Sequence, residues 1–544
     1  MKKLFTASIC LIIGIPALTQ TLEEGKKHLY YERYQSAEQH FGKLVQQQPG
    51  LAEAWYGLTL AHLYQEEPAK AAGILYNAPP SIRDDAWHAA AYGRLMLSQG
   101  KKDSAAGFFN HALDKTREKD PAILEAIARA HVETEAGDAA LALELTAKAL
   151  KRDKKNAALK TLEGDAHLKA RDGSAAYAAY KEAIEWDGNY APAYYKIGKI
   201  FSTQKNKELY LEYFNKALEA DAAYAPALQR MYVHYFYYDP AKALEYYNQY
   251  AANSDASPQR DYELADLYFV NKSYDKAIEK ASGIMGIQAE KAEPRLLKLI
   301  GYSYAGKGDT SRALSFMQQY FLTEADSNFL AKDYRAMAEF HEALSASPDS
   351  AMLYYTKAAS IEKDSAALFE YYKKLAGLYG NRKDFAGQAK WLGSYYRNNE
   401  KATNVDLFNW GLAWYRAEDY AMADSVFGMY VTKYPEQSFG YYWQARSNAA
   451  RDKEMDSGLA VPYYQALVQA LQKDTTNANY RNWMVEAYGY MAVYEANKDK
   501  DYEEAIGYFQ KVLSVDPDNE DAKKYIAVLE KSVKTESDKE AGNR

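Results

Sequence analysis

Histidine is the side chain most often used for metal ligation and for acid–base chemistry near neutral pH, and this chain has nine histidines. No two of them are four residues apart, the spacing that places two ligands on one face of a helix. His28, His62 and His167 fall at a position where related segments carry an aromatic residue, as at Phe201 and Tyr268. We therefore interpret these three histidines as packing residues between helices and expect no metal site.

The sequence contains no constellation that would activate a nucleophile or cradle a phosphate. Gly-x-Ser-x-Gly, His-Glu-x-x-His and a phosphate-binding glycine loop are all missing. Carboxylates are abundant, but they alternate with basic residues along helical faces, which is typical of a solvated surface. We therefore expect a protein that is not an enzyme and that needs no cofactor.

Tyrosine is the residue type that stands out, with 51 copies against 18 Phe and 8 Trp. Many tyrosines are adjacent pairs, such as Tyr194-Tyr195 and Tyr463-Tyr464. Neighbouring residues on a helix point about 100° apart, so one tyrosine of a pair can pack while the other faces a groove or solvent. Tyrosine suits either role, because it combines apolar area with a hydrogen-bonding tip. The pairs therefore indicate either core packing or an aromatic binding surface.

The single cysteine, Cys10, lies in an N-terminal segment with the pattern of an export signal. A positively charged start precedes about ten apolar residues, and a small-residue cleavage site follows near Ala17. A spanning helix needs about 20 apolar residues, so a cleaved signal is favoured over a short membrane anchor. It is also favoured over lipidation at Cys10, because too little apolar sequence precedes that residue. We expect a periplasmic or secreted protein of a Gram-negative bacterium, whose mature chain has no cysteine to oxidise.

The overall composition predicts a folded protein without nucleic-acid or membrane chemistry. Of 544 residues, 48% are hydrophobic and 26% are charged, and the formal net charge is -7 with both signs interleaved. Binding to nucleic acid would need a clustered basic face, which the sequence lacks. The mean hydropathy of -0.54 and the lack of a second long apolar segment argue against an integral membrane protein.

The elements that must position these side chains are helices, because the sequence repeats at a helical period. Ala37, Phe41 and Leu44 form a small–large–apolar pattern on one helical face, and Ala71 and Ala105 continue it at equal intervals. Residues spaced by four and then three lie on the same face of a helix. Small residues on that face allow a second helix to approach closely, and the larger residue fills the gap.

A second helix precedes each such pattern. It carries a small residue followed three positions later by an aromatic one, as at Gly198 and Phe201, and Gly164 precedes Gly198 by the same interval that separates the alanines. Pro435 and Pro517 follow later units, where proline ends a helix because it lacks an N–H group and clashes with the preceding turn. The sequence therefore predicts helix–turn–helix units in tandem.

These motifs resemble the tetratricopeptide repeat (TPR) family over nearly all of the chain. The clearest unit reads Trp410-Gly411-x2-Trp414…Tyr420-x2-Ala423-x3-Phe427-x7-Pro435. The resemblance implies an all-α fold, namely a right-handed α-solenoid of about 14 tandem helix–turn–helix repeats with a C-terminal capping helix. It also implies that the first helices of the pairs line a concave groove.

The regularity of the pattern divides the chain into segments. It is clean at both ends and looser in the middle, where loops such as 253–258 intrude. We expect a signal peptide at 1–19, an N-terminal TPR array at 20–255, divergent central TPR-like repeats at 256–402, a C-terminal TPR array with its capping helix at 403–532, and a charged disordered tail at 533–544.

The family's groove indicates which residues to test for binding. Side chains one step beyond the packed stripe of each first helix should point into the groove, and the small residues set the phase. This phasing nominates Tyr195, Lys199, Tyr262, Asp266, Lys298, Tyr302, Phe408 and Tyr415. The cytosolic co-chaperone type of TPR protein is not favoured, because Lys26 or Lys199 stands where that type carries asparagine.

The function that this reading favours is an exported scaffold or adaptor that binds protein partners in cell-envelope assembly or secretion. A groove of rigid helices would present preformed aromatic and polar contacts to a peptide segment. The alternative is a helical repeat protein of the cell envelope that captures glycans or other substrates with exposed aromatic side chains.

Overall fold

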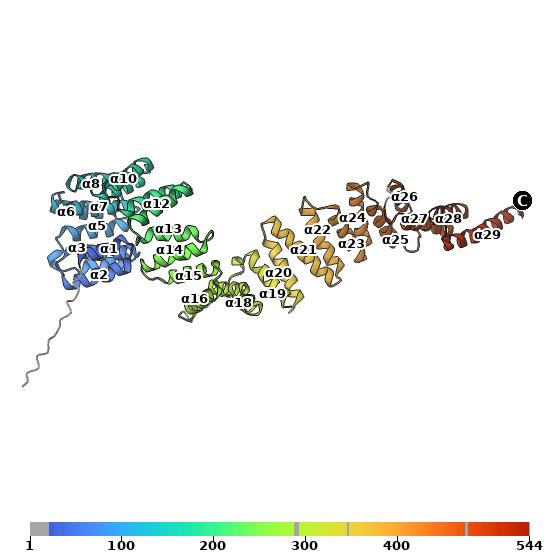
Figure 1. The fold of residues 1–544 in the computed structure, drawn as a ribbon, viewed down its shortest axis with the longest axis horizontal. Coiled ribbons are helices and arrows are strands. Elements are labelled where there is room, and N and C mark those ends of the chain that lie inside the picture. Colours follow the sequence, from blue (N-terminus) through green and yellow to red (C-terminus); the bar gives the residue numbers. More distant parts are fainter. Residues whose placement is uncertain (1–20, 288–292, 345–346, 474–476, 543–544) are drawn as a thin grey trace, which may run out of the picture. The chain divides into compact units, whose positions relative to one another are not determined.

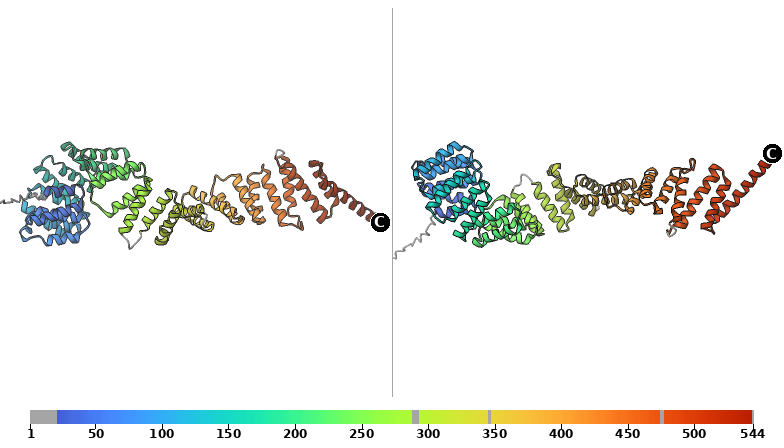
Figure 2. Two further views of the ribbon diagram at one scale, coloured as in Figure 1. Left: turned by 60° about the horizontal axis from the view of Figure 1, so that its bottom comes forward. Right: turned by 90° about the horizontal axis from the view of Figure 1, so that it is seen from above.

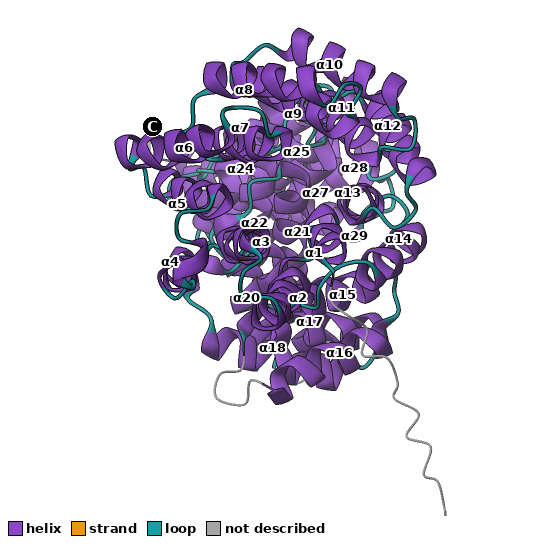
Figure 3. Cartoon of the chain, turned by 90° about the vertical axis from the view of Figure 1, so that its left-hand side faces the viewer, coloured by secondary structure: helices purple, strands orange, loops and turns teal. Residues whose placement is uncertain are grey.

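The computed structural model describes residues 21–287, 293–344, 347–473 and 477–542 (Figure 1). Over these ranges every regular element is helical, and no strand is present (Figure 3). Consecutive helices pack on one another as antiparallel neighbours along each unit (Figure 2). The predicted all-α, TPR-like solenoid is therefore confirmed. The expected signal segment 1–19, with Cys10, lies outside the described residues.

The chain divides into two compact units, Met1–Lys307 and Gly308–Arg544. The first unit contains α1 (Leu22–Tyr30), α2 (Tyr34–Gln47), α3 (Ala52–Tyr64), α4 (Pro68–Tyr76), η1 (Pro80–Ile82), α5 (Ala86–Ser98), α6 (Lys102–Thr116), α7 (Pro121–Glu133), α8 (Ala139–Arg152), α9 (Ala157–Lys169), α10 (Gly173–Trp186), α11 (Ala191–Thr203), α12 (Lys207–Ala220), α13 (Ala225–Tyr235), α14 (Pro240–Ala252), α15 (Pro258–Val270), α16 (Tyr274–Ile287) and α17 (Pro294–Gly306).

The second unit continues the same succession of helices. It contains α18 (Thr310–Thr323), η2 (Asp326–Asn328), α19 (Ala331–Ala343), α20 (Pro348–Ile361), α21 (Ser365–Asn381), α22 (Phe385–Asn398), α23 (Asn404–Arg416), α24 (Tyr420–Lys433), α25 (Ser438–Arg451), α26 (Val461–Lys473), α27 (Tyr480–Tyr494), η3 (Glu495–Asp499), α28 (Tyr502–Val515) and α29 (Glu520–Gly542). The segment boundaries expected at 255, 402 and 532 remain predictions.

Helix starts are encoded locally by short polar side chains. Asp138, Asp172 and Asn206 each precede a helix and accept a hydrogen bond from a backbone N–H of its first turn. Such a cap satisfies one of the four N–H groups that a helix leaves free at its start. The polar residue before each of these second helices therefore explains where that helix begins.

The contact between the two helices of a pair depends on glycine facing an aromatic ring. A Cβ atom added at Gly198 would lie only 2.6 Å from the ring of Phe214, and a Cβ at Gly164 would overlap the ring of Tyr180. Phe214 and Tyr180 are almost fully buried as a result. The small residue of a first helix and the large residue of the following helix thus form one packing unit, sixteen residues apart.

The C-terminal helix differs from its expected length. The sequence pattern ends the capping helix at residue 532 and predicts disorder from 533, whereas α29 continues to Gly542. The added segment contains two Lys and two Glu residues, which have high helix propensity even without an apolar face to bury. Within the described ranges, no helix combines the length and the apolar character needed to cross a membrane.

Candidate functional site: the interior of the N-terminal unit

The first unit closes on itself, because the turn between α1 and α2 reaches segments that lie far along the chain. The blue helices α1 and α2 lie beside the green helices α13 and α14 (Figure 1). The Tyr31 hydroxyl donates to a carboxylate oxygen of Asp221 at 2.9 Å, and Arg33 Nε donates to the Asn253 carbonyl at 2.7 Å. One turn of the solenoid is thereby joined end to end into a ring.

The strongest part of this closure is a helix cap supplied from a distance. The residue before α2, Arg33, makes no side-chain cap. Instead, the backbone N–H groups of Gln35 and Ser36 donate to Asp255 Oδ2 at 2.7 and 3.2 Å, and the Ser36 hydroxyl donates to Asp255 Oδ1 at 2.5 Å. We call the loop residues 253–256 the clasp. The Arg260 guanidinium holds it by donating to its backbone carbonyls.

The ring encloses a cavity of about 500 Å³. The first helices of the successive pairs provide most of its wall, from α1 through α3, α7 and α9 to α11. Aromatic side chains dominate the apolar part of the lining. Its tyrosines are Tyr30, Tyr34, Tyr56, Tyr64, Tyr190 and Tyr224, and Trp87 joins them.

A buried ionic network crosses one wall of the cavity. Glu133 accepts from Arg94 at 2.7 Å, from Arg129 at 3.3 Å and from the Tyr64 hydroxyl at 2.6 Å, and Arg129 also pairs with Glu125 at 2.7 Å. Burial alone would raise the pKa of Glu133, but the two guanidinium groups and the Tyr64 hydroxyl outweigh it and lower the pKa to about 2. The network therefore stays fully charged at neutral pH.

The remaining charges of the wall are also paired, with one exception among the described residues. Lys26 pairs with Glu53 and Lys196 pairs with Asp165, each at 2.8 Å. The Glu32 side chain makes no ion pair or hydrogen bond with any described residue, and it is open to the cavity. Burial within the ring raises the pKa of Glu32 even though Lys196 is near enough to lower it. The lining thus cancels most of its own charge.

Two hydroxyl groups in the wall have no partner in the described part of the chain. Tyr56 Oη on α3 and Thr161 Oγ1 on α9 are buried, and neither forms a hydrogen bond with a described residue. Arg94 Nη1, next to the cavity, is also without a partner among these residues. A buried polar group left unpaired costs about 1–3 kcal/mol, so neither hydroxyl group stabilises the fold as it stands. Because these atoms have almost no accessible surface, a ligand in the cavity would reach them only after the side chains rotate.

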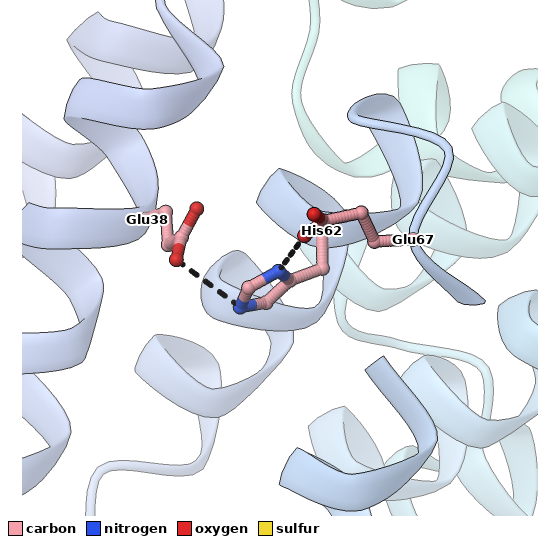
Figure 4. Close-up of side chains that lie close together, drawn as sticks. All are labelled: Glu38, His62 and Glu67. Atoms are coloured by element: carbon pink, nitrogen blue, oxygen red, sulfur yellow. Dashed lines mark hydrogen bonds and ion pairs between the residues drawn. The ribbon is translucent and has the colours of Figure 1, made fainter. Parts of the chain in front are cut away.

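A second cluster offers metal-ligand atoms outside the cavity. Atoms of Glu38, His62 and Glu67 lie within 4.8 Å of one another. His62 Nδ1 is 2.9 Å from Glu67 and Nε2 is 3.8 Å from Glu38, and the two carboxylates lie at opposite edges of the imidazole ring (Figure 4). Each ring nitrogen of His62 thus already faces a carboxylate. We assign His62 a bridging role between α2 and the start of α4.

The residues nominated from sequence do not line this cavity. Tyr195 and Tyr262 are each 8% exposed, and both rings are covered by a cation, Lys199 above Tyr195 and Arg295 above Tyr262. Arg295 also pairs with Asp266, so it joins two of the nominated side chains. As binding residues these four remain predictions.

The other nominated residues lie in two further places. Lys298 and Tyr302 are one turn apart on α17. Phe408 and Tyr415 on α23 both contact the Trp443 ring of α25, with ring centroids 6.4 and 4.9 Å apart. The structure thus brings the nominated residues together in pairs but not into one site.

The phasing rule that nominated the residues above also selects residues of the cavity when it is applied to the earlier repeats. Tyr195 and Lys199 lie three before and one after the small residue Gly198. The same offsets from Gly164 select Thr161 and Asp165, which line the cavity. The offset of one from Gly25 selects Lys26, which also lines the cavity, and the same offset from Gly93 selects Arg94, which pairs with the lining residue Glu133. The nominated residues lie in later repeats, and only Tyr262, Asp266, Lys298 and Tyr302 belong to the looser central part.

Comparison with known proteins gives structural likeness only. No protein-family model matches the chain, and no curated protein matches it in sequence. Among solved structures, the chain is similar to the C-terminal part of a TPR repeat-containing protein from Cytophaga hutchinsonii, with 22% identity, 49% of this chain and 99% of that chain covered, and a TM-score of 0.28. A tetratricopeptide repeat protein from Parabacteroides merdae is 15% identical, with 53% of this chain and 96% of that chain covered and a TM-score of 0.22. PilF of Pseudomonas aeruginosa is 14% identical, with 44% of this chain and 93% of that chain covered and a TM-score of 0.23.

Proposed function

We propose that this chain is an exported scaffold of the bacterial cell envelope that binds a segment of a partner protein inside the ring of its N-terminal unit. The observation that carries the proposal is the tyrosine-rich lining of the cavity, to which Tyr56 and Thr161 add two buried hydroxyl groups without a partner among the described residues. A hydroxyl group can donate to a backbone carbonyl or accept from a backbone N–H, as recognition of an extended peptide requires.

The rest of the lining supports a polypeptide ligand. Its charges are paired within the wall, which disfavours a highly charged ligand such as nucleic acid. Its tyrosines add rigid apolar area with polar tips, the composition favoured in protein interfaces. Glu32, which has no ionic partner in the described part of the chain, is the lining charge left to select a side chain of the bound segment.

The direct test is site-specific photo-crosslinking in the envelope of the native host. A photoreactive residue placed at Ala158, which lines the cavity, should capture a partner polypeptide. The same residue at Lys181, on the exposed face of α10, should not capture it. Adducts of equal yield from both positions, or carbohydrate adducts from Ala158, would contradict a peptide-binding ring.

A matched pair of variants links capture to the hydroxyl groups. Combining Tyr56→Phe with Thr161→Val removes both groups with little change in volume and should reduce the Ala158 adduct about tenfold or more, the loss expected for two hydrogen bonds. Tyr490→Phe removes from the second unit another buried hydroxyl without a described partner and should leave the adduct unchanged. Equal effects of the two changes would refute a role for the cavity hydroxyls.

Export is tested separately. The mature protein should begin after residue 19 and should be released from the periplasm by osmotic shock. A full-length chain with an intact N-terminus in the cytoplasm would contradict export, but it would not bear on peptide binding by the ring.

A further inference from the structure

Helix α2 obtains its N-terminal cap in an unusual way. Helices α8, α10 and α12 are capped by the residue directly before them, namely Asp138, Asp172 and Asn206. The cap of α2 comes instead from Asp255, which is 219 residues away from Ser36. A helix cap is normally a local feature, whereas this one forms only while the ring is closed.

The seam that Asp255 completes is weaker than the contacts along the stack. Successive helices are joined by fully buried apolar groups, such as Phe41 between α1 and α3. The seam consists of hydrogen bonds at half-buried or exposed positions, together with the packing of the partly buried Tyr30 and Tyr31 against the apolar cluster around Tyr224. The ring centroids of Tyr30 and Tyr224 are 5.5 Å apart. Hydrogen bonds exchange with water at small net cost, while apolar burial does not.

We propose that the clasp is a gate, which opens by releasing the α2 cap and so admits an internal segment of a partner chain sideways into the ring. The identity of the ligand rests on the function proposed above, but the gate itself does not. A closed ring admits only a free chain end, whereas an opening ring can take hold of a chain anywhere along its length. The gate therefore regulates the same site and sets which part of a partner can enter.

The opening can be measured without any ligand. In the full chain with Cys10→Ser, the change Ala158→Cys places the single thiol in the cavity wall. Two reagents then probe it, N-ethylmaleimide and a maleimide carried on a long polyethylene glycol chain. We expect the small reagent to react readily, and the large one to react slowly at a rate limited by opening.

Release of the cap should change only the rate at which the large reagent reacts with the thiol. Asp255→Ala should raise its rate about tenfold relative to that of N-ethylmaleimide, the factor that corresponds to losing a typical cap. Asp255→Asn should restore the slow rate, because asparagine caps a helix as well as aspartate does. Asp172→Ala removes the local cap of α10 and should leave the ratio unchanged.

Three results would overturn the gate. They are equal rates for both reagents in the unaltered ring, no change of the ratio in Asp255→Ala, or the same increase in Asp172→Ala. A working gate combined with failure of the crosslinking at Ala158 would instead reject the peptide ligand and leave the gate in place.

Discussion

Replacing Glu133 with glutamine tests whether the ionic network holds the wall of the ring. The change keeps the size of the side chain but removes the negative charge that faces Arg94 at 2.7 Å and Arg129 at 3.3 Å. Arg94 is only 3% exposed, so its guanidinium would remain buried without its carboxylate. Removing one partner of a buried ion pair lowers the stability of a protein more than replacing both partners with apolar residues.

The magnitude follows from the pKa of the carboxyl group. The native pKa of about 2 lies well below the unperturbed value of 4.5. At about 1.4 kcal/mol per pKa unit, the charged form is favoured by about 3 kcal/mol in the folded state. The Glu133 side chain is 29% exposed to the interior, which makes this figure an upper limit. Because the native pKa is lowered, the stabilisation is present above pH 4.5 and is lost as the pH falls toward 2.

The assay must be local, because a repeat array need not unfold in one step. Hydrogen exchange of the α7 amides should show Glu133→Gln to be less stable than the native chain by about 2–3 kcal/mol near neutral pH. The difference should shrink as the pH falls below the ordinary carboxyl pKa. Glu144→Gln is the matched control, since Glu144 is 59% exposed and pairs with Lys148, so it should cost less than about 1 kcal/mol. A difference that is absent at neutral pH, or that persists near pH 2, would refute the reasoning.

Three further changes test other parts of the ring by chemical denaturation and local hydrogen exchange. Tyr56→Phe should stabilise the unit by up to about 1–3 kcal/mol because it removes a buried hydroxyl group with no described partner. Tyr180→Phe should instead cost about 1.5–3 kcal/mol because its hydroxyl group donates to a carboxylate at 2.7 Å. Gly164→Ala should cost about 1–3 kcal/mol because its Cβ would meet the Tyr180 ring, while Gly173→Ala, in open space, should stabilise by up to about 1 kcal/mol. Glu32→Gln should stabilise the unit at neutral pH because burial raises the pKa of Glu32, and the gain should vanish below the ordinary carboxyl range. Equal effects of the two tyrosine changes, equal effects of the two glycine changes, or a pH-independent effect of Glu32→Gln would contradict these accounts.

The fold could be predicted because its signals are local. Gly164 and Tyr180 lie sixteen positions apart, and the packing of one against the other depends on nothing beyond a single helix pair. The triplet Ala37, Phe41 and Leu44 is buried as its spacing predicts. Each repeat contacts mainly its neighbours, so the constant repeat period is enough to specify the chain's architecture.

The site could not be predicted with the same ease, because the ring is closed by contacts between residues that are far apart in the sequence. Nothing near Ser36 in the sequence indicates that its helix is capped by Asp255, and the loop around Asp255 reads as an interruption of the pattern. The partner of Ser36 is set by the accumulated rotation of the intervening repeats, to which every helix crossing contributes a little. The lack of a capping residue before α2 does not single it out, because Glu67 before α4 and Lys101 before α6 make no side-chain cap either.

The clasp has a consequence for how the N-terminal unit can change in evolution. Repeat arrays can gain or lose a unit, because each unit needs only its neighbours. Between Ser36 and Asp255 that freedom is gone, since one added helix pair would carry the carboxylate past the helix end that it caps. The clasp therefore fixes the number of repeats in the ring. The repeats beyond Asp255 can be duplicated or deleted without affecting this contact.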